Sequence, residues 1–225
     1  MLKQNKRKLV VDIETDSLDA TVIHVAVTKD IDTKEVRSFR NGKDFTAHIH
    51  SVPSVFIMHN GISFDAPVLN KFWNARIKVN DCIDTLLLSR LFKPIREKGH
   101  ALDAWGIYIG CPKIHFNDFE KYSEEMLKYC KQDVEVTEKT FYRLLEEGKD
   151  FSEESMVLEH EVQHIISKQI KVGFNFDLQK AQLLLADLMQ RANDIQKEIT
   201  EKWLPVVALD KEVSVRYTKD GSLSK

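Results

Sequence analysis

The chain has 225 residues, of which 43% are hydrophobic and 30% are charged, with only 8 glycines and 5 prolines. This composition excludes a disordered or low-complexity protein and indicates one large domain, or a medium-sized domain with a smaller extension. The formal net charge of −2 excludes a protein that holds nucleic acid through an overall positive charge, so a polynucleotide would have to bind in a local groove.

The cysteines and the N-terminus indicate the compartment. The cysteines Cys82, Cys111 and Cys130 are scattered and form no C-x-x-C pattern, so we expect reduced, buried thiols. No apolar run is long enough to cross a membrane, and no signal peptide follows the basic N-terminus. These features predict a cytoplasmic protein without a membrane partner.

The first part of the chain predicts an antiparallel meander. Residues 8–15, 22–28 and 34–39 each have the composition of a strand, and short polar segments join them. Residues 53–58 are almost wholly apolar, which predicts a central strand covered on both faces.

Two acidic residues lie on the first of these strands. Asp12 and Glu14 are two residues apart, so their side chains are expected to point to the same face. Neighbouring carboxylates repel each other unless protons or cations intervene, and their oxygens suit Mg²⁺ or Mn²⁺. The alternative is a strand end that carries two solvated acids.

The next elements place a third acid beside a buried strand. Residues 66–73 predict a helix with Asp65 at its start, where a carboxylate often serves as the N-cap. Residues 79–84 predict a fifth strand, and residues 85–91 predict a helix that Asp84 caps.

A long amphipathic helix is predicted over residues 123–147. Tyr129 and Asp133 are four residues apart and therefore share one helix face. The alternatives are a core aromatic side chain at Tyr129 and an exposed acid at Asp133.

The helical pattern breaks after residue 147, which predicts a domain over residues 1–150 and an all-α extension over residues 151–225. The extension contains two expected helices, 151–172 and 177–203. Residues 213–225 resemble the first strand of a hairpin whose second strand is missing, so we expect the chain to be a split subunit or a truncation.

Four carboxylates and one tyrosine thus form a candidate catalytic constellation. Asp12, Glu14, Asp65 and Asp133 could together hold two divalent cations, the arrangement that serves in-line displacement at phosphorus. Asp12 would bridge both ions, and the Tyr129 hydroxyl would orient the attacking water.

The same residues resemble a known family. Residues 12–14, 59–65 and 129–133 are similar, in this order, to the three exonuclease motifs of the DEDD superfamily. The third motif matches the Tyr subclass, because the His subclass would have histidine at position 128, where this chain has lysine.

The resemblance extends to residues 82–91 and 100–106, which look like the exonuclease domain of phage replicative DNA polymerases of family A, relatives of bacterial DNA polymerase I. It implies an α/β protein with an RNase H-like mixed five-stranded sheet flanked by helices, and a 3′–5′ exonuclease that proofreads single-stranded or frayed DNA ends. It also implies that Leu18, Asn60 and Phe64 bind DNA.

The polymerase motifs of the family are absent, so this chain should not polymerise DNA. The resemblance implies a second chain with the polymerase palm and fingers, and the cytoplasm of a host cell if a phage encodes the protein. The alternative is a non-catalytic DNA-binding or structural subunit of a split polymerase.

A remote alternative is a zinc metalloprotease, because residues 160–164 read His-Glu-Val-Gln-His. The core stripe of that helix is expected to consist of Leu158, Val162, Ile165 and Gln169. Both histidines would then face solvent or a partner.

Overall fold

The structure, a computed structural model, describes residues 6–203. Residues 1–5 and 204–225, which include the strand expected at 213–225, lie outside the described residues. Within the described part no helix is both long enough and apolar enough to cross a bilayer.

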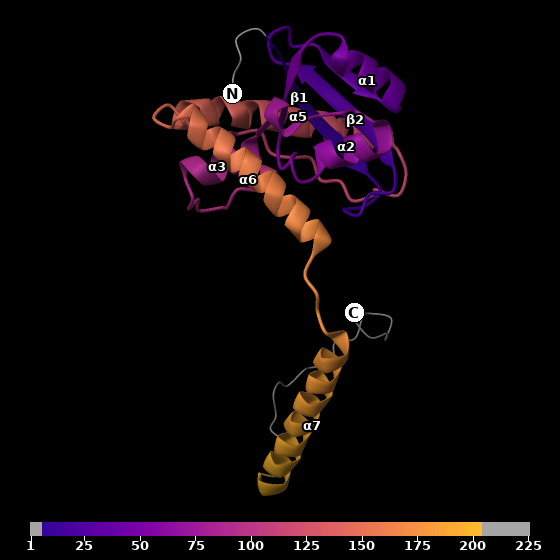
Figure 1. Cartoon of the computed structure of the whole chain (residues 1–225), viewed down its shortest axis with the longest axis vertical. Coiled ribbons are helices and arrows are strands. Elements are labelled where there is room, and N and C mark those ends of the chain that lie inside the picture. Colours follow the sequence, from indigo (N-terminus) through magenta and orange to yellow (C-terminus); the bar gives the residue numbers. More distant parts are fainter. Residues whose placement is uncertain (1–5, 204–225) are drawn as a thin grey trace, which may run out of the picture. The chain divides into compact units, whose positions relative to one another are not determined.

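The architectural centre is a five-stranded mixed sheet in the order β3-β2-β1-β4-β5. Figure 1 labels two of its strands, β1 and β2. Its strands are β1 (Arg7–Thr15), β2 (Ile23–Asp30), β3 (Val36–Phe39), β4 (Ser54–Met58) and β5 (Cys82–Asp84). The first three strands are antiparallel neighbours, whereas β4 runs parallel to β1 and β5 runs parallel to β4. The meander, the fully buried β4 and the mixed sheet confirm the predicted fold class.

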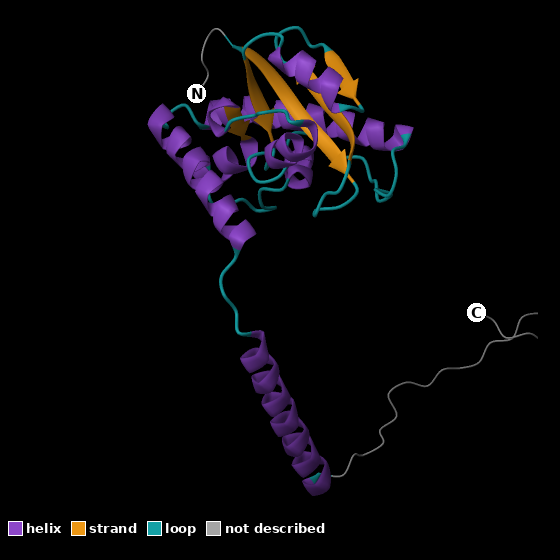
Figure 2. Ribbon diagram, turned by 45° about the vertical axis from the view of Figure 1, so that its right-hand side comes forward, coloured by secondary structure: helices purple, strands orange, loops and turns teal. Residues whose placement is uncertain are grey.

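Helices lie on both sides of this sheet (Figure 2). They are α1 (Gly42–His50), α2 (Asp65–Trp73), α3 (Thr85–Phe92), α4 (Leu102–Tyr108), α5 (Glu124–Glu147) and α6 (Glu153–Val172). A further helix, α7 (Leu178–Lys202), belongs to a second unit of the chain.

Alternation along β1 supplies side chains to two separate cores. Leu9 and Val11 pack with α1 and α2 on one face, and Val10 packs with α4 and α5 on the other. Because successive strand residues alternate between faces, Asp12 and Glu14 lie on the face that α5 covers. The predicted common direction of these two carboxylates follows from this pattern.

Several predicted elements have different bounds in the structure. The third strand begins at Val36, two residues later than expected. Helix α1 begins at Gly42, where the Asn41 side chain caps it by accepting a hydrogen bond from the Asp44 N–H. The fifth strand is only three residues long, since Val79–Asp81 form a 3-10 turn, η1. Asp84 caps α3 as predicted, accepting from the Leu86 N–H.

The packed face of α6 differs from the prediction. Leu158, Val162 and Ile165 were expected to form its core stripe, but their exposed fractions are 58%, 38% and 57%. Instead His160, expected to face solvent or a partner, is only 2% exposed. The reason is that α6 packs against η1 and α3, where a buried backbone N–H needs an acceptor.

Two compact units divide the chain, the first ending at Gly173 and the second beginning at Phe174. The first unit therefore contains α6 as well as the sheet. In the second unit the described part is α7, which Asp177 caps, and no residue of α7 is buried.

Candidate functional site

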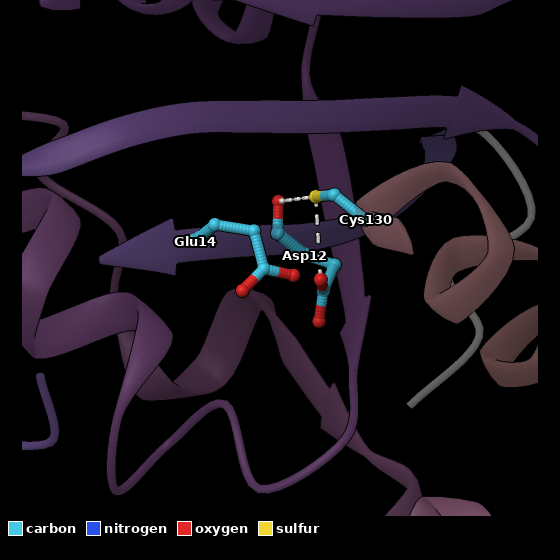
Figure 3. Close-up of side chains that lie close together, drawn as sticks. All are labelled: Asp12, Glu14 and Cys130. Atoms are coloured by element: carbon cyan, nitrogen blue, oxygen red, sulfur yellow. Dashed lines mark hydrogen bonds between the residues drawn. The ribbon is translucent and has the colours of Figure 1, made fainter. Parts of the chain in front are cut away.

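Strand β1 contributes the first two carboxylates of the candidate site. Oxygens of Asp12 and Glu14 lie within 4.8 Å of each other and of the Cys130 sulfur (Figure 3). The Cys130 thiol, fully buried on α5, lies 3.3 Å from Asp12 Oδ2 and 3.6 Å from the Asp12 backbone oxygen. The thiol therefore donates to Asp12 and fixes α5 directly over the carboxylates of β1.

Helix α5 contributes Tyr129 and Asp133, which share one face as predicted. Asp133 is 4% exposed, and its Oδ2 lies 2.6 Å from the ammonium group of Lys113. The same ammonium group lies 4.8 Å from the centre of the Tyr129 ring. The second Asp133 oxygen, Oδ1, is buried without any hydrogen-bond partner.

Helix α2 begins with Asp65, which is 5% exposed. The expectation that Asp65 caps this helix is wrong: the N-cap residue is Phe64, and no side chain makes a cap hydrogen bond. Burial raises the pKa of Asp65, and the backbone N–H of Ile13 acts against this rise, which places the carboxylate next to β1.

The four carboxyl groups act on one another's charge. Burial raises the pKa of Asp12 well above its usual value, and Glu14, Asp133 and Asp65 each raise it further. Burial and Asp133 raise the pKa of Glu14 to about 8, and burial raises that of Asp65 to about 7. Burial also raises the pKa of Asp133, against the opposing effect of Lys113. Asp65 and Asp133 are therefore near enough to act on the charge of Asp12, although the group whose ligand atoms all lie within 4.8 Å of one another consists of Asp12, Glu14 and Cys130.

The chemistry of these residues is suited to divalent cations. The cluster offers hard oxygen donors, its carboxylates repel one another, and a buried oxygen of Asp133 lacks a partner. A bound cation would reduce the repulsion between the carboxylates and give the unpaired Asp133 oxygen a partner. Mg²⁺ and Mn²⁺ prefer carboxylate oxygens. Asp12, Glu14, Asp65 and Asp133 are therefore the residues that fit such ions.

A buried hydrogen-bond network supports the loop that leads to Asp65. The Asp84 carboxylate accepts from the backbone N–H groups of Asn60 at 2.9 Å and Ile62 at 3.1 Å. The Asp84 N–H in turn donates to Nε2 of His160 at 2.8 Å. Sequence reasoning assigned Asp84 to the cap alone and did not predict this second role.

The zinc alternative is disfavoured by the same network. His160 Nδ1 lies 2.7 Å from the Met156 carbonyl oxygen, so Nδ1 must donate and Nε2 must be the acceptor for Asp84. Burial lowers the His160 pKa to about 4, which keeps this neutral form. Neither ring nitrogen is left to bind a metal, and His164 alone cannot form the two-histidine site.

Two of the three residues expected to bind DNA line one groove, and Phe64 directly precedes Asp65 in the chain. Leu18, in the turn between β1 and β2, is 91% exposed. Leu18 and Phe64 both line a groove of about 550 Å³, together with residues of α2 and α6. Asn60 is exposed in the β4–α2 loop with a positive φ of 65°, and it does not line this groove.

Two residues of the cluster were not predicted as part of the site. Cys130 was identified only as a core residue, and its place next to Tyr129 was the one signal for a second role. Lys113 lies in the irregular segment between α4 and α5, where no periodicity reveals which way a side chain points.

Known proteins similar to this chain were found by sequence and by structure. No protein-family model matches the chain. The chain is 28% identical over 261 aligned positions to the DNA-directed DNA polymerase of Escherichia phage T7, and equally to that of Enterobacteria phage T3. Each match covers 86% of this chain but only 37% of the polymerase.

Among solved structures, the chain is similar to exonuclease X in complex with 5′ overhanging duplex DNA, with a TM-score of 0.47 and 16% identity. This match covers 68% of the chain and 99% of that structure. The homology with the two phage polymerases confirms the resemblance to phage DNA polymerases that the sequence motifs predicted.

Proposed function

We propose that the chain is a 3′–5′ exodeoxyribonuclease of the DEDD superfamily, Tyr subclass, and the proofreading part of a phage DNA polymerase of family A. It would hydrolyse the terminal phosphodiester of single-stranded or frayed DNA. The observation that carries the proposal is the burial of acidic side chains from β1, α2 and α5 that raise the pKa of Asp12, with an oxygen of Asp133 left unpaired.

Each acidic side chain has a role in this proposal. Asp12, Glu14, Asp65 and Asp133 would hold two Mg²⁺ or Mn²⁺ ions, and Cys130 would orient the Asp12 carboxylate through its thiol. The ions, when bound, supply Lewis acidity for the phosphate and for the attacking water. The Tyr129 hydroxyl, on the same helix face as Asp133, would orient that water by a hydrogen bond.

The groove that Leu18 and Phe64 line would receive a single-stranded 3′ end. Leu18 and Phe64 supply apolar surface for a base, and Lys168 and Lys171 of α6 also line the groove, where they could meet phosphates. Asn60 would contact the strand from the neighbouring loop. A paired end would be cut more slowly, because unpairing a base costs a few kcal/mol.

We also propose that residues 151–225 begin a polymerase region and that a second chain carrying palm and fingers docks there. The support is the exposure of apolar side chains on α6, among them Leu158 at 58% and Ile165 at 57%. Size-exclusion chromatography of the chain with and without such a partner tests the docking, and the absence of a complex would contradict it.

Digestion of end-labelled oligonucleotides tests the activity. With a 5′ label and Mg²⁺ or Mn²⁺, we expect a ladder that shortens from the 3′ end, the release of 5′-mononucleotides, and no reaction with EDTA. Asp12→Asn should remove this activity, whereas Asp150→Asn, which removes an exposed carboxylate without a described contact, should not. Activity that survives in Asp12→Asn would contradict the proposal, and binding without cleavage by the wild-type chain would favour the non-catalytic alternative.

A further inference from the structure

Lys113 is a cationic side chain inside the carboxylate cluster, although it belongs to none of the three motifs. Its side chain is 18% exposed, and its ammonium group contacts Asp133 Oδ2 at 2.6 Å. Among residues 6–203, no other ion pair reaches Asp12, Glu14, Asp65 or Asp133. Among the described residues, Lys113 is therefore the positively charged side chain that pairs with the carboxylate cluster.

The backbone around Lys113 is anchored to α5 rather than free. The Gln132 side-chain amide donates to the Pro112 carbonyl oxygen at 3.0 Å and contacts the Cys111 sulfur at 3.4 Å. The Cys111 N–H also bonds to the Gly106 carbonyl oxygen at 2.8 Å, which ties the segment to α4. Because Gln132 directly precedes Asp133, one turn of α5 sets the position of both the lysine and its carboxylate partner.

The two oxygens of Asp133 are in different situations. Oδ2 is bonded to the Lys113 ammonium group, whereas Oδ1 is buried and has no partner. A cation held by Asp133 would share this carboxylate with a positive charge. Like charges at such short range repel strongly in a site that contains little water.

We infer that Lys113 is a positioning residue that holds Asp133 and, by its charge, lowers the affinity of the carboxylate cluster for divalent cations. The inference rests on the proposed function, because it concerns the same metal site. It assigns to Lys113 a role in setting the metal concentration at which the enzyme works. The lysine keeps the metal-free cluster from accumulating unbalanced negative charge, and the bound cation takes over this role.

Direct binding of Mn²⁺ to the DNA-free chain tests the inference, measured from the loss of the free Mn²⁺ signal in electron paramagnetic resonance. Lys113→Met removes the charge but keeps a long aliphatic side chain, and we expect it to bind Mn²⁺ about tenfold more tightly than the wild type. Lys113→Arg should resemble the wild type. Lys121→Met, an equal change of charge at an exposed position on the same segment, should also leave the affinity unchanged.

A second measurement needs only the wild-type chain and covers the case in which Lys113→Met fails to fold. Coupling between two sites is reciprocal, so Mn²⁺ should weaken the pairing of Lys113 with Asp133. Mass spectrometry of the acetylated chain should therefore show that Lys113 reacts faster with Mn²⁺ present, whereas the reactivity of Lys121 stays constant.

The outcomes separate the two proposals. Equal or weaker Mn²⁺ binding by folded Lys113→Met, or unchanged acetylation of Lys113 in saturating Mn²⁺, would overturn this inference while the proposed function stands. A wild-type chain that binds no Mn²⁺ would overturn the metal site itself, and the role of Lys113 with it.

Discussion

Replacement of Glu14 by glutamine should make the metal-free protein more stable at alkaline pH. The side chain is 7% exposed, and its pKa of about 8 compares with 4.5 for an ordinary glutamic acid. Burial is the main cause, and repulsion by Asp133 adds to it. The folded state therefore binds this proton more tightly than the unfolded state does.

The sign and size of the effect follow from this difference. A carboxyl group whose folded-state pKa is raised contributes stability below its unfolded pKa, and that stability is lost as the pH rises through its folded pKa. Each unit is worth about 1.4 kcal/mol, so the wild type should lose up to about 5 kcal/mol through Glu14 between about pH 4.5 and 8. Because Glu14 titrates together with its neighbouring carboxylates, protonation of any one of them relieves part of the repulsion, so the stability change of about 5 kcal/mol is an upper bound.

Urea denaturation in EDTA, at about pH 5 and about pH 9, measures the free energy of unfolding of each variant. Glu14→Gln should match the wild type at the lower pH and exceed it by a few kcal/mol at the higher pH. Glu97→Gln, which changes an exposed glutamate without a described contact, should follow the wild type. A Glu14→Gln protein with the pH dependence of the wild type would refute the reasoning.

Three further substitutions test the site and its support. Tyr129→Phe should slow oligonucleotide digestion by about 10²-fold, less than the loss of a metal ligand, because only a water-orienting hydroxyl is removed; an unchanged rate would contradict the role of Tyr129. His160→Ala should lower the free energy of unfolding by about 1–3 kcal/mol, because the buried Asp84 N–H loses its acceptor, and an unchanged urea midpoint would argue against this hydrogen bond. Gly61→Ala should cost about 1–3 kcal/mol in the same assay, since its new Cβ would collide with the Met58 side chain, and a fully stable variant would mean that the loop can shift freely.

Local patterns in the sequence were sufficient to predict the part of the site that lies on regular elements. Strand alternation gave the common direction of Asp12 and Glu14, and helical spacing gave that of Tyr129 and Asp133. The resemblance to exonuclease motifs indicated that this strand and this helix lie close together in the fold. No local pattern could have shown that the Asp65 carboxylate lies against β1 rather than on the end of its own helix.

The remaining features depend on tertiary contacts. The face of α6 was predicted wrongly because its apolar residues were assumed to be its buried ones, whereas His160 is buried to satisfy a backbone N–H far away in the sequence. Lys113 was missed for a similar reason: an irregular segment has no period, so only the fold brings it to Asp133.

The hydrogen bond between His160 and the start of α3 has a practical consequence for anyone who shortens this protein. Cutting after α5, where the sequence motifs end, would delete an imidazole that the interior of the sheet domain requires. In a fragment that ends near residue 150, water would reach the residues that support the loop before Asp65. The activity of such a fragment would then be weak even though its catalytic residues are intact. A fragment that continues through Gly173 keeps this support, so its activity can be attributed to the catalytic residues themselves.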